Sequence, residues 1–244
     1  MWYHGYRTED VMVLRDDTTN PRKLPTRRNM IAAMKWLVEG AQKDDSLFFH
    51  YSGHGSQTPD EDGDEIDGYD EVIFPTDYKK RGHIVDDEMF RIMVRPLPAG
   101  CRLTALFDVR TQSTHRVEML IRRSPAIQEL SSIFLMWCAH AYYTPSGRKK
   151  GIHVTSRALQ RKSSRADVIS WSGCKDDQKS TDTFQGGQAV GAMSYAFINS
   201  LKRNPHVTYQ HLLKCLNDLL YSRFNQSPQL GSSHHIDTNL QFVI

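Results

Sequence analysis

One histidine lies between two glycines directly after an apolar run, and this arrangement limits the folds open to the chain. Residues 47–51 read as a buried strand, and Gly53, His54 and Gly55 follow in an expected turn. In open α/β sheets, ligands bind outside the carboxyl ends of the strands. Eight of the twelve residues from 60 to 71 are acidic. This context favours a functional histidine at a sheet edge over an ordinary loop histidine.

Apolar runs alternate with amphipathic helical patterns along the chain. Strands are expected at 11–14, 47–51, 71–74, 103–107, 165–172 and 240–243, and helices after Thr26, over 86–93, over 188–201 and after Thr208. Strands that alternate with helices indicate an α/β fold, with a mostly parallel central sheet and helices on both faces.

Length and composition fit a single globular domain. The chain has 244 residues, and 39% of them are hydrophobic, which is enough for a sizeable core. No apolar run approaches the length of a membrane span, and Met1 opens on folded-looking sequence without a signal peptide. The four cysteines are irregularly spaced and form no CxxC pair, which indicates reduced thiols and no structural zinc. We therefore expect a cytoplasmic or nuclear protein with no membrane partner.

Positive charge is concentrated in one stretch. The net charge is +3, but residues 109–166 carry eleven Lys or Arg and two Glu, a net +9. Such a block is either a solvated, protease-accessible loop or a nucleic-acid patch. It lacks the regular aromatic interleaving of proteins that bind single strands. We therefore expect a basic linker and no nucleic-acid partner.

Five motifs together resemble the metacaspases, the caspase-like cysteine peptidases. They are Tyr51-Ser52-Gly53-His54-Gly55, Asp67-Gly68-Tyr69-Asp70-Glu71, Ile84-Val85-Asp86-Asp87-Glu88, Trp171-Ser172-Gly173-Cys174-Lys175-Asp176 and Ser232-Ser233-His234. The resemblance covers roughly residues 5–108 and 160–244. It implies a caspase-like fold, in which residues 1–108 and 164–244 form the large-subunit-like and small-subunit-like parts of one domain. A divergent basic linker over 109–163 would join them.

The chain departs from the family pattern at two places. The family carries Asp-Ser-Cys-His-Ser-Gly after the strand 103–107, whereas here Asp108 is followed by Val109 and Arg110. Arg110 therefore stands at the position of the nucleophilic cysteine. The family also opens with a core strand and helix that have no counterpart here, so one central strand and part of the substrate pocket are expected to be missing.

None of the four cysteines is a convincing replacement for the nucleophile. Cys101 begins the strand that leads to the catalytic edge, and about seven residues of strand place it roughly 20 Å away. Cys174 and Cys215 lie where cysteines of the family are not nucleophiles. Cys138 lies two residues from His140, in a region without a family match.

The resemblance also implies roles for the residues around the histidine. His54 would be the base that takes the proton of a thiol. Ser52 and Asp108 would belong to an acidic pocket that binds the Arg or Lys side chain before the scissile bond, because a guanidinium pairs best with carboxylates. Arg110, two residues from Asp108, could instead fill that pocket as an internal substrate mimic.

Calcium is the cofactor that the resemblance implies. Asp70, Asp86 and Asp87 align with the calcium carboxylates of the family, and Glu88 is a weaker candidate. Calcium requires several hard oxygen ligands around the ion. A solvated acidic face is the alternative, and it is the better interpretation of residues 60–65.

Three interpretations remain open. The chain is a metacaspase-family cysteine endopeptidase by descent that is now inactive, or a non-catalytic caspase-fold regulator. Such a regulator would bind active metacaspase relatives or basic peptide and protein substrates. The third interpretation is an imperfect translation of an active enzyme, with a retained intron after Asp108. The transcript across the Asp108 codon would distinguish this last case.

Overall fold

The computed structural model describes residues 7–61, 68–110, 117–124, 141–143, 149–151, 164–173, 182–185 and 188–243. In chain order the elements are η1 (Thr8–Asp10), β1 (Val11–Arg15), α1 (Arg27–Val38), β2 (Ser46–Pro59), β3 (Tyr69–Ile73), α2 (Tyr78–Arg81), β4 (Ile84–Val85), α3 (Asp86–Met89), η2 (Phe90–Val94), β5 (Arg102–Arg110), β6 (Glu118–Ser124), β7 (Ala141–Tyr143), β8 (Lys149–Gly151), β9 (Asp167–Ser172), β10 (Asp182–Gln185), β11 (Gln188–Gly191), α5 (Ala192–Arg203), α6 (Tyr209–Phe224) and β12 (Gln229–Ser232).

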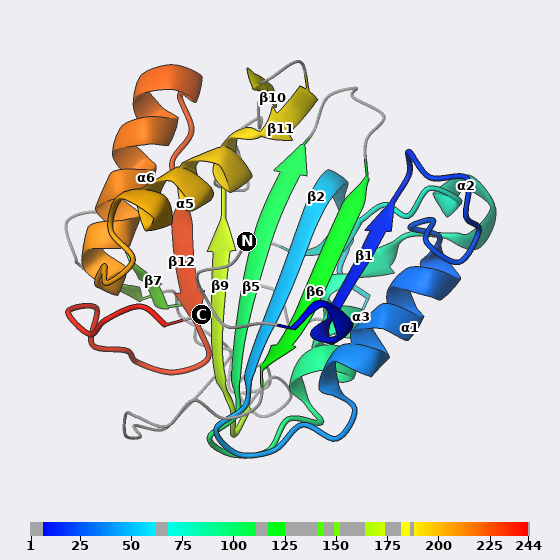
Figure 1. Cartoon of the computed structure of the whole chain (residues 1–244), viewed down its shortest axis with the longest axis horizontal. Coiled ribbons are helices and arrows are strands. Elements are labelled where there is room, and N and C mark those ends of the chain that lie inside the picture. The colour runs from blue at the N-terminus through cyan, green and yellow to red at the C-terminus, as the bar shows by residue number, and fades with distance from the viewer. Residues whose placement is uncertain are drawn as a thin grey trace.

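One mixed sheet forms the centre of the molecule, with the strand order β1-β6-β2-β5-β9-β12-β7-β8 (Figure 1). Its central strands β2, β5 and β9 are parallel, as the alternation of strands and helices predicts. β12 is antiparallel to β9, and β7 and β8 continue the sheet in antiparallel pairs. The second half of β2 leaves this sheet and pairs with β3, which pairs in turn with β4. The expected α/β fold is confirmed.

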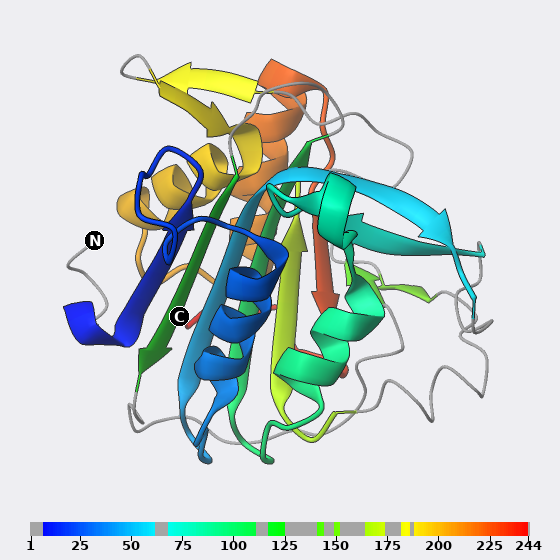
Figure 2. The same cartoon turned by 90° about the vertical axis from the view of Figure 1, so that its right-hand side faces the viewer.

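Helices cover both faces of the sheet (Figures 1 and 2). Two separate clusters of buried hydrophobic residues form the cores. On one face, Met30, Met34 and Leu37 of α1 pack with η2 against the sheet. On the other face, α5 and α6 pack around Trp171 of β9. Thr26 and Thr208 cap the helices that follow them, because the side chain of each accepts a hydrogen bond from the backbone N–H at the third position of its helix.

β6 is the main difference from the sequence prediction. Glu118–Ser124 lies inside the stretch assigned to a basic linker, yet it forms a strand between β1 and β2, antiparallel to both. Ile121 is opposite Met12 on one side and Phe49 on the other, and it is fully buried. The guanidinium of Arg123 lies 4.6 Å from the ring centre of Trp36. The sequence did not indicate this strand, because its apolar run, residues 119–121, is short and is followed directly by two arginines.

Two smaller predictions are also corrected. Residues 188–191 form β11 and the helix begins at Ala192, where the sequence predicted one helix from 188. Residues 240–243 form no strand but one isolated bridge between Gln241 and Thr208. The resemblance leads us to expect that one central strand is missing, yet in the described sheet the strands from β1 to β9 form a continuous hydrogen-bonded series, with β6 between β1 and β2.

Candidate functional site

His54 and residue 110 lie opposite each other at the carboxyl edge of the sheet. β2 and β5 are parallel, and their register pairs His54 with Arg110 and Ser52 with Asp108. His54 is partly buried. The backbone of Arg110 is described, while its side chain is outside the described part. The sheet therefore brings the expected base and the expected nucleophile position onto adjacent strands.

The two glycines beside His54 serve packing rather than a turn, which corrects the expectation of a glycine-rich loop. β2 runs without a break from Ser46 to Pro59. A Cβ on Gly53 would lie 2.6 Å from the Tyr51 hydroxyl, and one on Gly55 would overlap Val109. The Tyr51 hydroxyl itself donates a hydrogen bond to the His54 carbonyl, at 2.6 Å. The backbone around His54 is thus fixed by Tyr51.

Asp108 lies inside the molecule, against the start of helix α5. It is fully buried, and Ser52 beside it is nearly so. The Asp108 Oδ2 atom accepts hydrogen bonds from the backbone N–H and the hydroxyl of Ser194, at 2.8 and 2.5 Å. Ser194 also lies 2.9 Å from Nε2 of His50. Neither His50 nor Ser194 was singled out in the sequence, because their contact joins positions 144 residues apart.

Comparisons with known proteins agree with the motifs. The family model for the metacaspase, peptidase C14 domain matches residues 1–120. The chain is 49% identical to Metacaspase-1 of Cryptococcus neoformans, over 98% of this chain and 57% of that protein. It is 48% identical to Metacaspase-1A of Aspergillus fumigatus, over 98% of this chain and 63% of that protein. This chain belongs to the metacaspase family.

This metacaspase spans less than two thirds of the length of these curated relatives. A crystal structure of a protein from Geobacter sulfurreducens is similar with a TM-score of 0.52 at 20% identity, and the match covers 87% of this chain and 75% of that one. That likeness supports the caspase-like α/β fold alone. No helix in the described part of the chain is long and apolar enough to cross a membrane.

The expected calcium ligands lie near one another in the backbone arrangement. Asp70 is on β3, while Asp86 and Asp87 begin α3 directly after β4, and β3 pairs with β4 through Val72 and Val85. Glu88 is bound elsewhere, in a 2.5 Å ion pair with Arg27. Among the described residues, no group of three or more His, Cys, Asp or Glu side chains is gathered closely enough to hold a metal ion. Calcium binding by this metacaspase stays a prediction.

The described cysteines have the properties of inert thiols. Cys101 is fully buried, and burial, with Asp45 and Asp167 nearby, raises the pKa of its thiol to about 12. Burial also raises the pKa of Cys215. A thiol attacks as its thiolate, so neither group is activated at neutral pH. Cys138 and Cys174 lie outside the described residues.

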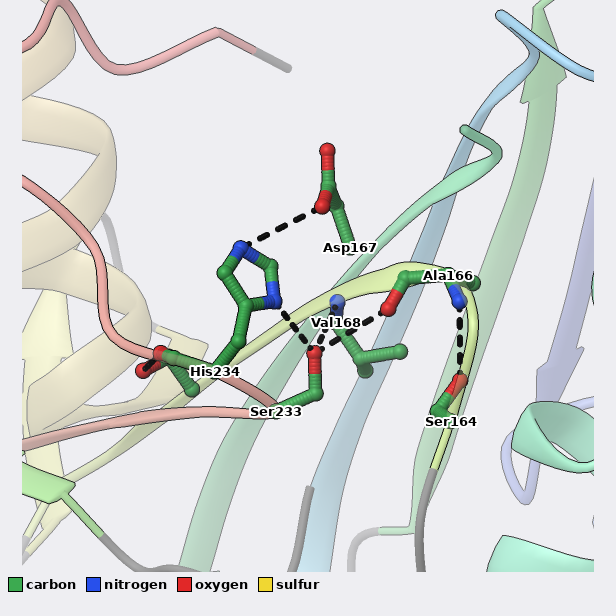
Figure 3. Close-up of polar contacts among 7 residues, drawn as sticks. Ser164, Ala166, Asp167, Val168, Ser233 and His234 are labelled. Carbon is green, nitrogen blue, oxygen red and sulfur yellow. Dashed lines mark hydrogen bonds and ion pairs between the residues drawn. The ribbon is translucent and has the colours of Figure 1, made fainter. Parts of the chain in front are cut away.

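A second group of Ser, His and Asp side chains lies at the opposite edge of the sheet (Figure 3). Ser233 Oγ is 3.0 Å from Nδ1 of His234, whose Nε2 is 3.2 Å from Asp167. Asp167 pairs with Arg102 at the start of β5, whereas Arg110, at the end of β5, lies beside His54. Between these two ends, about eight residues of β5 span roughly 26 Å, which separates the second group from His54.

This second group joins strands and is not a catalytic triad. Ser233 is fully buried, and its hydroxyl already accepts a hydrogen bond from the backbone N–H of Val168 at 3.0 Å and donates one to the carbonyl of Ala166 at 3.1 Å. Burial lowers the pKa of His234, while Asp167 acts in the opposite direction. Ser232-Ser233-His234, one of the five motifs behind the family resemblance, thus fixes the end of β12 to the start of β9.

Proposed function

We propose that this chain is a metacaspase-fold protein without cysteine-peptidase turnover. The observation that carries the proposal is the register of β2 and β5, which puts Arg110 opposite His54. A guanidinium stays protonated in proteins and offers no electron pair for attack on a carbonyl carbon. In a comparable hydrolase, loss of the nucleophile costs on the order of a millionfold in turnover.

The proposed partners follow from the expected base His54 and from Ser52 and Asp108, which are expected to bind a basic side chain. We propose basic peptides, proteins with exposed Arg or Lys, or an active metacaspase relative as the molecules that this chain binds. Calcium at Asp70, Asp86 and Asp87 is the proposed ion. A cytoplasmic or nuclear location is proposed with them. If the transcript joins the Asp108 codon directly to a Ser-Cys-His segment, the imperfect-translation interpretation replaces this proposal.

Turnover is tested with a fluorogenic peptide that ends in Arg, in millimolar calcium. We expect no cleavage above the buffer rate for the wild-type chain. The matched control is His54→Ala, because genuine cysteine-peptidase turnover depends on the base. Turnover in the wild type that His54→Ala abolishes would refute the proposal.

The underlying geometry is tested separately with Arg110→Cys. This variant places a thiol opposite His54, so we expect its alkylation by iodoacetamide to exceed the wild-type background. Adding His54→Ala should slow that alkylation, because a neighbouring imidazole favours the reactive thiolate. Equal alkylation rates with and without His54 would show that residue 110 does not face the histidine.

A further inference from the structure

Helix α5 has no capping side chain of its own. Its N-cap residue is Gly191, which makes no side-chain hydrogen bond to the helix. The first backbone N–H groups of a helix lack partners within the helix and need acceptors from elsewhere. Asp108 of β5 supplies one, because its Oδ2 atom accepts the backbone N–H of Ser194, the third residue of the helix. A carboxylate is also stabilised by the positive end of the helix dipole.

Gly191 is required by this contact. A Cβ on Gly191 would overlap the carboxylate of Asp108, closer than any real carbon could approach. The glycine, the Ser194 N–H and the Ser194 hydroxyl therefore enclose one face of the same carboxylate. Asp108 is held closely by the first turn of α5, and no solvent reaches it.

His50 extends this contact to a third element. The Ser194 hydroxyl donates its hydrogen to Asp108, so its oxygen accepts the hydrogen on Nε2 of His50. Two hydrogen bonds in series therefore link His50 on β2 to Ser194 on α5 and Ser194 to Asp108 on β5. Ordered hydrogen-bond chains of this kind strengthen their members, and all three residues are at least partly buried.

We propose that Ser194 and His50 are positioning residues that close the Asp108 pocket, so that a basic side chain reaches Asp108 only when the first turn of α5 releases it. The inference rests on the proposed role of Asp108 in binding basic side chains. In that arrangement, the apparent affinity for a guanidinium is its affinity for the open pocket multiplied by the fraction of molecules whose pocket is open, and this fraction is small. Weakening the closed state raises this fraction.

The test measures binding of Nα-acetyl-arginine amide by calorimetry, with the thermal unfolding midpoint recorded for each variant. We expect weak binding by the wild type and at least tenfold tighter binding by Ser194→Ala, equivalent to about 1.4 kcal/mol. Ser200→Ala is the matched control, because Ser200 is a buried serine on the same helix and its hydroxyl has no hydrogen-bond partner in the described part of the chain. This control should bind like the wild type.

Three further variants separate closure of the pocket from general loosening. His50→Ala should also tighten binding, whereas His50→Gln should restore the wild-type value, since a Gln amide can donate from nearly the same place as Nε2. Adding Asp108→Asn to Ser194→Ala should abolish the gained binding.

The outcomes distinguish this inference from the proposed function. If Ser194→Ala and the wild type bind equally well, the closed pocket alone is refuted. If neither binds, the proposed role of Asp108 in binding basic side chains is refuted with it. If the gain persists with Asp108→Asn, the ligand binds elsewhere and the inference is also refuted. The peptidase result does not enter this comparison, because binding is measured without turnover.

Discussion

Replacing Ile121 with alanine tests whether β6 is part of the core. The sequence places residue 121 in a basic linker, where truncation of a side chain costs within about 0.5 kcal/mol. In the structure Ile121 is fully buried between Met12 and Phe49. Removing three carbons costs roughly 2.4 kcal/mol in transfer free energy, at about 0.8 kcal/mol each. The cavity adds to this, and buried Ile→Ala changes typically cost about 2 to 5 kcal/mol.

The free energy of unfolding is measured by urea titration with linear extrapolation to water. The control is Ile198→Ala, the same chemical change at a side chain that is 48% exposed on α5. We expect a loss of at least about 2 kcal/mol for Ile121→Ala and less than about 1 kcal/mol for the control. Equal small losses would refute the placement of β6 in the sheet, and would restore the linker interpretation for the whole of 109–163.

Three further predictions concern calcium, pH and proteolysis. Calorimetric titration should show weak calcium binding that Asp86→Ala/Asp87→Ala abolishes and Glu9→Ala leaves unchanged; identical heats in all three would dispose of the calcium site. Burial lowers the pKa of His234 below its ordinary 6.5, with a further contribution from His235. Because the unfolded chain then binds more protons than the folded one, the free energy of unfolding should fall as the pH drops from 7 through the His234 pKa. His234→Gln should make the free energy of unfolding depend less on pH in this range, and an unchanged dependence would contradict the prediction. Limited trypsin should cut first between Arg148 and Arg165 and leave two associated fragments, since β5 pairs with β9 from Arg102 to Phe107; separation on gel filtration would exclude the single sheet.

The sequence was most informative where an expected site residue directly follows an apolar run, because such a run predicts a strand from local sequence alone. The apolar run before His54 and the one before Asp108 predicted two strands with functional carboxyl ends, and the register of β2 and β5 brings those ends together. The α/β fold followed from the alternation of elements. The roles of His54, Ser52 and Asp108 stay predictions, because the geometry shows their places and not their chemistry.

Long-range pairing was beyond the reach of the sequence. β6 has only three consecutive apolar residues, 119–121, and its position depends on β1 and β2, which lie far away in the chain. The contact of Asp108 with Ser194 joins residues 86 apart, and no local pattern signals it. The glycines beside His54 suggested a turn, whereas their real constraint is the space taken by Tyr51 and Val109.

The position of β6 also has a consequence for the chain during its synthesis. In the described sheet, β1 has β6 as its one neighbour, and about 100 residues separate Arg15 from Glu118. At 5–20 residues per second, a ribosome needs about 5 to 20 s to cover that distance. For this interval the backbone groups of β1 and one edge of β2 have no strand to pair with, and unpaired edges template aggregation. Codons that slow translation between Arg15 and Glu118 would therefore lengthen the period in which chaperones must protect the nascent protein.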